Sequence, residues 1–132
     1  MKHIVLGLTI VAALIAAAMP LMAHHSFAAE FDSAKQIKLS GVVTKIDWTN
    51  PHVWFYFDVK DEKGAVTNWG AEMGPPHLLQ GSGWTRTTMK IGDTINVQGS
   101  LAKNGSKRLN ARAVTTPDGK RMGAASSEGV TP

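Results

Sequence analysis

The chain has 132 residues, of which 43% are hydrophobic and 18% are charged, and its formal net charge at pH 7 is +4. This length fits one small domain with a single core, together with a targeting segment. The basic residues are scattered rather than clustered, which argues against a dedicated phosphate-binding surface. The chain contains no cysteine, so disulfide scaffolds and thiolate metal sites are excluded.

Residues 1–23 have the pattern of an export signal. Lys2 supplies a positive start, a long apolar run follows it, and Pro20 breaks this run before the small residue Ala23. We therefore expect a signal peptide that is cleaved after Ala23, a periplasmic mature chain, and no membrane span after cleavage. The alternative is an uncleaved membrane anchor, because the run approaches the roughly 20 apolar residues that a span needs if Met19–Ala23 are counted.

The two histidines that follow this segment are the first candidates for a metal site. Cleavage after Ala23 would make His24 the first residue, and its α-amino nitrogen and imidazole could then chelate one metal together. His25 adds a second imidazole. Neutral imidazole suits late transition metals, whose affinities reach a maximum at Cu(II). The alternative is that these residues form an ordinary solvated terminus.

The first half of the domain contains three segments with strand character. Residues 36–48 alternate apolar and polar side chains, with a change of parity after Gly41 that indicates a bulge or a bend. Residues 52–60, "HVWFYFDVK", are the clearest strand because the alternation is unbroken. The loop "DEKG" then predicts a hairpin that leads to a strand over 65–73.

The register of this hairpin decides which side chains share a face. Opposing Lys60 to Ala65 places His52 across from Met73. The same register brings three large aromatic side chains to one face of the sheet, namely Trp54, Tyr56 and Trp69.

The second half contains a short helix and two more strands. "PHLLQ" favours a helix that begins near Pro76, and residues 94–103 and 108–116 alternate as strands. Residues 117–132 have little apolar material to bury and predict a flexible tail. This element order is typical of an all-β, five-stranded OB-type barrel over residues 24–116, with a short helix or loop between strands three and four. A small open β-sandwich is the alternative.

Three motifs, "HHSFAAEFD", "TNPHVWFY" and "NWGAEMG", carry a family resemblance. In these segments the chain resembles a family of small exported bacterial proteins of unknown function. The resemblance extends from His24 to about Gly119. It implies an exported bacterial protein, and it implies no activity or catalytic residue.

His52 is the second candidate metal ligand, with Met73 across from it in the expected register. An imidazole and a thioether together suit copper, particularly Cu(I). The N-terminal histidines would join them if Phe27 and Phe31 anchor the mature terminus at the start of the strand over 52–60. The predicted metal site then consists of His24, His25, His52 and Met73. The alternative for the His52 and Met73 pair is ordinary packing.

Two functions remain open. The first is a periplasmic binding protein for copper or another late transition metal. The second is a non-metal interaction module, in which the aromatic face binds a small organic ligand or a periplasmic partner protein through Trp54, Tyr56 and Trp69. Expected export and the small net charge argue against nucleic acid as a partner. No catalytic residue is predicted, since the sequence has no recognisable catalytic motif.

Overall fold

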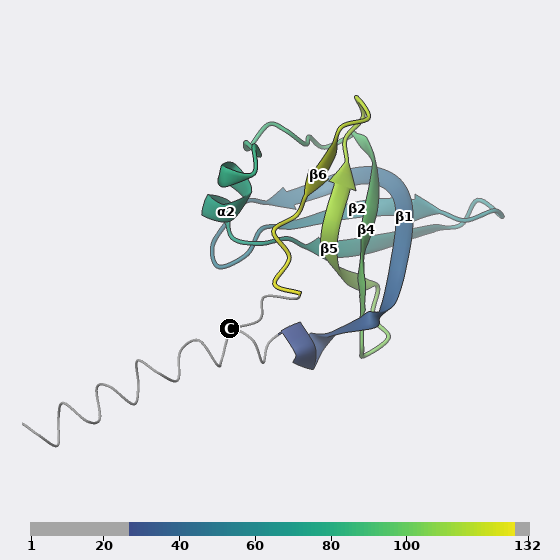
Figure 1. The fold of residues 1–132 in the computed structure, drawn as a ribbon. Coiled ribbons are helices and arrows are strands. Elements are labelled where there is room, and N and C mark those ends of the chain that lie inside the picture. Colours follow the sequence, from purple (N-terminus) through teal and green to yellow (C-terminus); the bar gives the residue numbers. More distant parts are fainter. Residues whose placement is uncertain (1–26, 129–132) are drawn as a thin grey trace, which may run out of the picture.

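The computed structural model describes residues 27–128 (Figure 1). A helical turn over 27–30 is followed by β1 (Phe31–Asp47), β2 (Trp54–Lys60), β3 (Val66–Glu72), α2 (Pro76–Gly81), β4 (Thr94–Ala102), β5 (Arg108–Thr115) and β6 (Arg121–Gly123). The expected signal peptide, His24 and His25 lie outside the described residues. Within residues 27–128, no helix is both long enough and apolar enough to cross a membrane.

The strands form one sheet that closes on itself. Their order is β3-β2-β1-β4-β5-β6, and each neighbouring pair is antiparallel. In addition, β3 pairs with β5 in parallel, which completes a ring of the first five strands. This ring, with a short helix between its third and fourth strands, has the OB-type architecture. The predicted fold is therefore confirmed, and the open sandwich is wrong.

Strand β1 connects the two sides of the ring because it is long and bends. Residues 31–32 and 36–42 pair with β4, with an irregularity between them, whereas residues 42–43 and 45–47 pair with β2. At Gly41 an added Cβ would collide with the carbonyl oxygen of Asp58, so this close approach of two strands requires glycine. The bend lies where the sequence predicts it, and the bulge itself lies at Thr44, which has no partner in β2.

The hairpin between β2 and β3 differs from the predicted register by one residue. Lys60 pairs with Val66 rather than with Ala65, because the loop is one residue longer than expected. The backbone N–H of Asp61 donates to the carbonyl oxygen of Ala65 at 2.9 Å, and Gly64 takes a left-handed conformation with φ of +83°. A slip of one residue moves the side chains of a strand to the opposite face. The predicted faces of β3 are therefore exchanged relative to β2.

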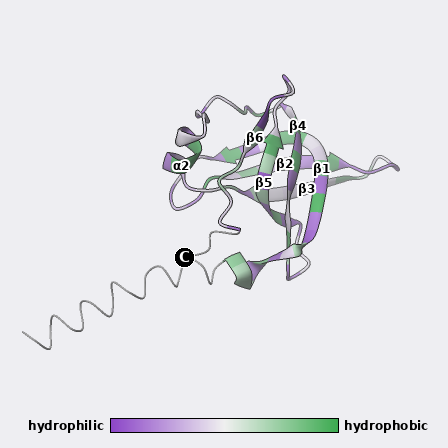
Figure 2. Ribbon diagram, viewed as in Figure 1, coloured by the Kyte–Doolittle hydropathy of each residue, from purple (hydrophilic) through white to green (hydrophobic). Residues whose placement is uncertain are grey.

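Hydrophobic side chains fill the ring, and α2 with the following loop covers one end of it. In Figure 2 the strands carry green, hydrophobic positions, whereas the hairpin tips are mostly purple or white. Pro76 begins α2, where a missing backbone N–H leaves no helical hydrogen bond unmade, and Leu79 is the buried residue of this helix. Trp84 in the following loop is only 2% exposed. Its indole N–H donates to the carbonyl oxygen of Gly123 at 2.8 Å, which connects the loop to β6.

The segment after β5 belongs to the fold as far as residue 128, which differs from the predicted tail. Strand β6 pairs with β5, and the side chains of Met122 and Ala124 are buried. The composition of the segment conceals this, because two buried side chains and one strand pairing are enough to hold it against the ring. Residues 129–132 of the predicted tail lie outside the described residues.

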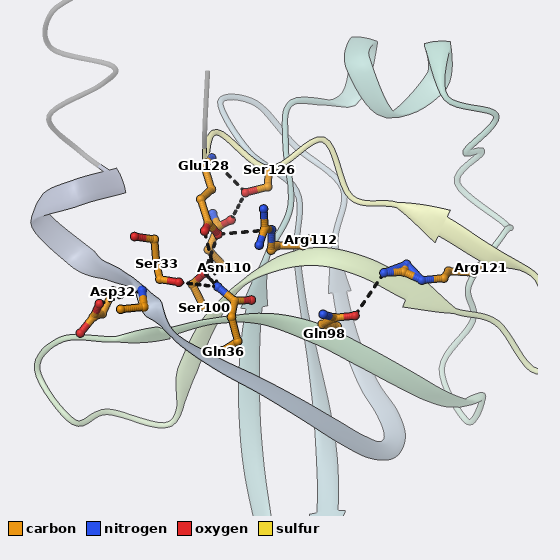
Figure 3. Close-up of polar contacts among 11 residues, drawn as sticks. Asp32, Ser33, Gln36, Gln98, Ser100, Asn110, Arg112, Arg121, Ser126 and Glu128 are labelled. Atoms are coloured by element: carbon orange, nitrogen blue, oxygen red, sulfur yellow. Dashed lines mark hydrogen bonds and ion pairs between the residues drawn. The ribbon is translucent and has the colours of Figure 1, made fainter. Parts of the chain in front are cut away.

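A polar cluster holds the last described residues against β4 and β5 (Figure 3). The Glu128 carboxylate accepts a hydrogen bond from Ser100 Oγ at 2.5 Å and lies 3.5 Å from Arg112 Nε. Ser126 Oγ donates to Asn110 Oδ1 at 2.5 Å. Ser100 and Asn110 are buried, and their polar groups have partners in this cluster, as buried polar groups do in stable folds. We therefore interpret the cluster as a structural clamp for the C-terminal segment.

Candidate functional site

The start of β2 and the end of β3 bring His52 and Glu72 together. Because Trp54 pairs with Glu72 across the two strands, the imidazole two residues earlier lies beside the same carboxylate. His52 Nδ1 is 2.5 Å from Glu72 Oε1, and the two side chains are 32% and 10% exposed. The hydrogen bond occupies Nδ1, so Nε2 is the imidazole nitrogen that remains able to bind a ligand.

A cavity of about 270 Å³ lies against this pair, which we call the histidine pocket. Its lining residues are Phe27, Glu30, Phe31, Pro51, His52, Trp54 and Glu72. The rings of Phe27 and Phe31 lie 5.7 Å apart, and Phe31 is only 3% exposed. Burial of this aromatic pair anchors the first described residues at the start of β2, as the sequence predicts.

The pocket changes the acidity of Glu72. Burial raises the pKa of its carboxyl above the ordinary value, since a charged group is poorly solvated there. The charge of His52 acts in the opposite direction, and the nearby charge of Glu30 raises the pKa further. Burial is the largest of these effects, so the carboxyl retains its proton to a higher pH than an exposed glutamic acid.

This raised pKa predicts how the stability of the metal-free protein depends on pH. Folded Glu72 keeps its proton above the ordinary value of 4.5, so its contribution to stability is complete below the unfolded pKa. That contribution is lost as the pH rises through the folded pKa. Glu72→Gln should remove this loss, so the free energy of unfolding of the variant should fall less steeply as the pH rises above about 4.5.

Urea unfolding with EDTA at a series of pH values measures the difference between wild type and variant. Glu62→Gln in the exposed hairpin loop is the matched control, and it should keep the wild-type slope. Equal slopes for the wild type and Glu72→Gln would contradict the raised pKa. His52, Glu30 and Arg108 are the charged groups that act on the Glu72 carboxyl. All three are present in both the wild type and Glu72→Gln, so the difference in slope reports the loss of the Glu72 carboxyl.

Met73 was predicted to lie beside His52, and the structure shows that it does not. It is 1% exposed in the core, and its backbone N–H donates to the carbonyl oxygen of Val53 at 2.8 Å. The predicted pairing is therefore wrong by one residue, and Glu72 takes the place expected for Met73. The cause is the additional loop residue in the preceding hairpin, which a left-handed Gly64 accommodates.

Trp69 is likewise separated from the aromatic residues with which the sequence predicts a shared face. It pairs with Phe57 and is 9% exposed in the core. Trp54 and Tyr56 lie on the opposite, outer face of β2, where they are half-buried. Arg108 was not predicted from the sequence, and its guanidinium carbon lies 5.2 Å from the centre of the Trp54 ring. No sequence signal marks this contact, because the parallel pairing of β3 with β5 creates it.

Among the residues from 27 to 128, no three His, Cys, Asp or Glu side chains are grouped so that they could hold a metal ion. The described part of the predicted metal site is therefore His52, oriented by Glu72. The predicted ligands His24 and His25 precede the described chain. Any complete metal site at the histidine pocket needs these or other additional donors.

The closed ring and the helix between β3 and β4 define an OB-fold protein. The chain belongs to the DUF6152 family, a family of unknown function whose model matches residues 12–111. Among curated proteins, no sequence matches this chain significantly.

Several solved structures resemble the fold. The mitochondrial single-stranded DNA-binding protein Rim1 of S. cerevisiae is 7% identical, with 62% of this chain and 92% of that chain covered and a TM-score of 0.49. The small single-stranded DNA-binding protein of Streptomyces coelicolor is 21% identical, with 61% and 90% covered and a TM-score of 0.46. The N-terminal domain of PriB from Thermoanaerobacter tencongensis is 13% identical, with 63% and 96% covered and a TM-score of 0.40. At these identities the likeness concerns the fold alone.

These similar structures correct one expectation. Expected export and a small net charge predicted that nucleic acid is not a partner. Single-stranded DNA-binding proteins are among the solved structures that resemble this chain, so that exclusion is withdrawn. The ligand class has to be inferred from the surface residues of this chain.

Proposed function

We propose that this protein is an exported, periplasmic binding protein that holds copper, or another late transition metal, between its mature N-terminus and His52. The observation that carries the proposal is the position of Phe27, which lines the same pocket as His52 and Glu72. The first described residue of the chain therefore lies beside the His52 imidazole, whose Nδ1 already binds Glu72 and whose Nε2 is left for a ligand.

The distance along the chain supports this arrangement. One residue spans at most about 3.6 Å, so the Cα atoms of His25 and His24 are limited to within about 7 Å and about 11 Å of the Cα of Phe27. These lengths are short enough to deliver a side chain to the histidine pocket. Cleavage after Ala23 would create a free α-amino group on His24, next to its own imidazole.

The resulting donors are nitrogen atoms. His24 supplies its α-amino nitrogen and its imidazole, and His52 supplies Nε2, while His25 offers a further imidazole. A set of nitrogen donors of this kind suits Cu(II), which prefers a tetragonal arrangement. A carboxyl oxygen of Glu72 accepts a hydrogen bond from His52 Nδ1, which orients the ring and increases the basicity of Nε2.

The proposal is tested on the chain that an exporting cell produces. Intact mass should show a mature terminus at His24, and titration of this protein should show saturable Cu(II) binding. Loss of an outer-shell partner typically lowers metal affinity by about 10 to 100-fold, so His52→Ala, which removes a ligand, should lower it by about 100-fold or more.

The control for this titration is His77→Ala, which removes an exposed histidine on α2 and should leave the affinity unchanged. A different mature terminus would contradict cleavage after Ala23. Equal Cu(II) affinities of the wild type and His52→Ala would contradict the metal site, whatever the terminus.

A further inference from the structure

We infer that the outer face of β1 and β2 binds a neutral carbohydrate chain. This surface is a shallow cavity of about 580 Å³, which we call the aromatic groove. Its lining residues are Ile46, Asp47, Trp48, Thr49, Trp54, Tyr56 and Arg108. The groove shares Trp54 with the histidine pocket, its other lining residues differ, and the inference does not depend on metal binding.

Three large aromatic side chains give the groove its apolar floor. Trp48, Trp54 and Tyr56 are half-buried and line the cavity, so part of each ring is open to a ligand. Trp54 and Tyr56 are two residues apart on β2 and therefore point to the same side, about 7 Å from each other along the strand. Lys45 lies over the Tyr56 ring and Arg108 over the Trp54 ring, so a ring-shaped ligand would contact the parts of the two rings that these cations leave open, as in binding sites that combine aromatic walls with a few polar groups.

Gly70 allows this floor to be flat. It lies across from Tyr56 on β3 and beside Arg108 on β5. An added Cβ at Gly70 would lie 3.2 Å from Tyr56 Cε1 and 3.7 Å from Arg108 Cγ. The absence of a side chain therefore lets the Tyr56 ring and the stem of Arg108 lie close to the β3 backbone.

The charged groups around the groove are of both signs and largely cancel. Lys45 Nζ is 2.8 Å from Asp47 Oδ2 and 5.2 Å from the centre of the Tyr56 ring. Arg108 lies over the Trp54 ring. A carboxylate accepts hydrogen bonds and a guanidinium donates them, so Asp47 and Arg108 can bind hydroxyl groups on either side of a sugar ring. Balanced charge of this kind suits an uncharged, hydroxyl-rich ligand.

A single-stranded oligonucleotide is the main competitor, because nucleobases also stack on aromatic side chains. Its phosphates need a continuous excess of cations. Acidic residues flank the aromatic platform at both ends instead. Asp58 follows Tyr56 on the same face of β2 and accepts a hydrogen bond from Asn68 at 2.7 Å, and Asp47 lies across from Trp54 on β1. These carboxylates favour a neutral chain over a polyanion.

The test uses the mature chain with EDTA and two neutral probes, maltohexaose and chitohexaose, together with a thymidine hexanucleotide. Isothermal titration and tryptophan fluorescence should show saturable binding of at least one hexasaccharide. Trp54→Ala should lower its affinity by about 10-fold or more, as expected for a central aromatic contact. Tyr56→Ala should also weaken binding, and it leaves the lining of the histidine pocket unchanged.

Leu78→Ala is the control, since this side chain is 50% exposed on α2 and lies outside the groove lining. Circular dichroism of each variant establishes that it is folded. Binding of neither hexasaccharide would overturn the inference, as would binding that both aromatic variants leave unchanged. Binding of the hexanucleotide alone, weakened by salt and by Trp54→Ala, would replace it with a nucleic-acid site. The Cu(II) titration of the wild-type chain and of His52→Ala tests the histidine pocket separately, whichever of these outcomes is found.

Discussion

Acetylation of the α-amino group of the mature chain should lower Cu(II) affinity by about 100-fold or more. The proposed site uses the amino nitrogen and the imidazole of His24 as a chelate, so binding of one nitrogen holds the other at a high effective concentration. Linked binding of this kind raises affinity by about 10² to 10⁴-fold without any new contact. An acetylated nitrogen is no longer basic, and the chelate is lost while every side chain remains.

The measurement is a competitive Cu(II) titration of the free and acetylated proteins at one pH. Their melting temperatures with EDTA should agree, which shows that acetylation leaves the fold intact. Combining acetylation with His52→Ala should lower the affinity further, because the two changes remove different donors. Equal affinities of the free and acetylated chains would show that the amino group is no ligand, and the proposed site would then be wrong.

Trp84→Ala should destabilise the fold by about 3 to 5 kcal/mol, the range that large aromatic truncations in a core produce. Trp84 is 2% exposed, and the substitution removes its ring from the core. It also leaves the carbonyl oxygen of Gly123 without the indole N–H that it accepts at 2.8 Å. The loss is large compared with the total stability of about 5 to 15 kcal/mol that is typical of folded domains.

Urea unfolding of the metal-free proteins measures this loss. Trp84→Phe keeps most of the buried volume and removes the hydrogen bond, so its loss should be smaller than that of Trp84→Ala. Leu78→Ala on the exposed side of α2 should change the stability by less than about 0.5 kcal/mol. A loss below about 1 kcal/mol for Trp84→Ala would mean that the loop after α2 contributes little to the core.

The two proposed sites are neighbours, and Trp54 lines both of them. Substitution of Trp54 is therefore expected to weaken ligand binding in the aromatic groove and to change the shape of the histidine pocket, because Trp54 forms part of its lining. Tyr56 lines only the groove, and His52 lines only the pocket. Variants at these two positions separate the binding of a carbohydrate from the binding of a metal.

Local patterns in the sequence determined most of the secondary structure. Alternation over 52–60 and 94–103 predicted two of the strands within two residues of their ends, because a strand with one buried face repeats every second residue. "PHLLQ" predicted α2, since proline is favoured in the first turn of a helix. Phe27 and Phe31 predicted where the start of the described chain is anchored, because two large apolar side chains gain free energy when they are buried together.

The register, and with it the composition of the site, was decided by tertiary structure. The sequence between β2 and β3 is compatible with a hairpin loop of four or five residues. Which loop forms depends on whether Gly64 takes a left-handed conformation. The one additional loop residue shifts the register, so that Glu72 rather than Met73 lies beside His52. The same shift places the Trp69 side chain in the core.

The remaining features depend on contacts between distant segments. The parallel pairing of β3 with β5 closes the ring and brings Arg108 over Trp54. Met122 is buried in β6, which pairs with residues 113–115 of β5 beyond the part of β5 that pairs with β3, and no local pattern reveals this pairing. The sequence by itself determined most of the strands, the helix α2 and the residues whose side chains can bind a ligand. Only the closed sheet decided which of them meet, because pairing between strands far apart in the chain depends on the geometry of the whole ring.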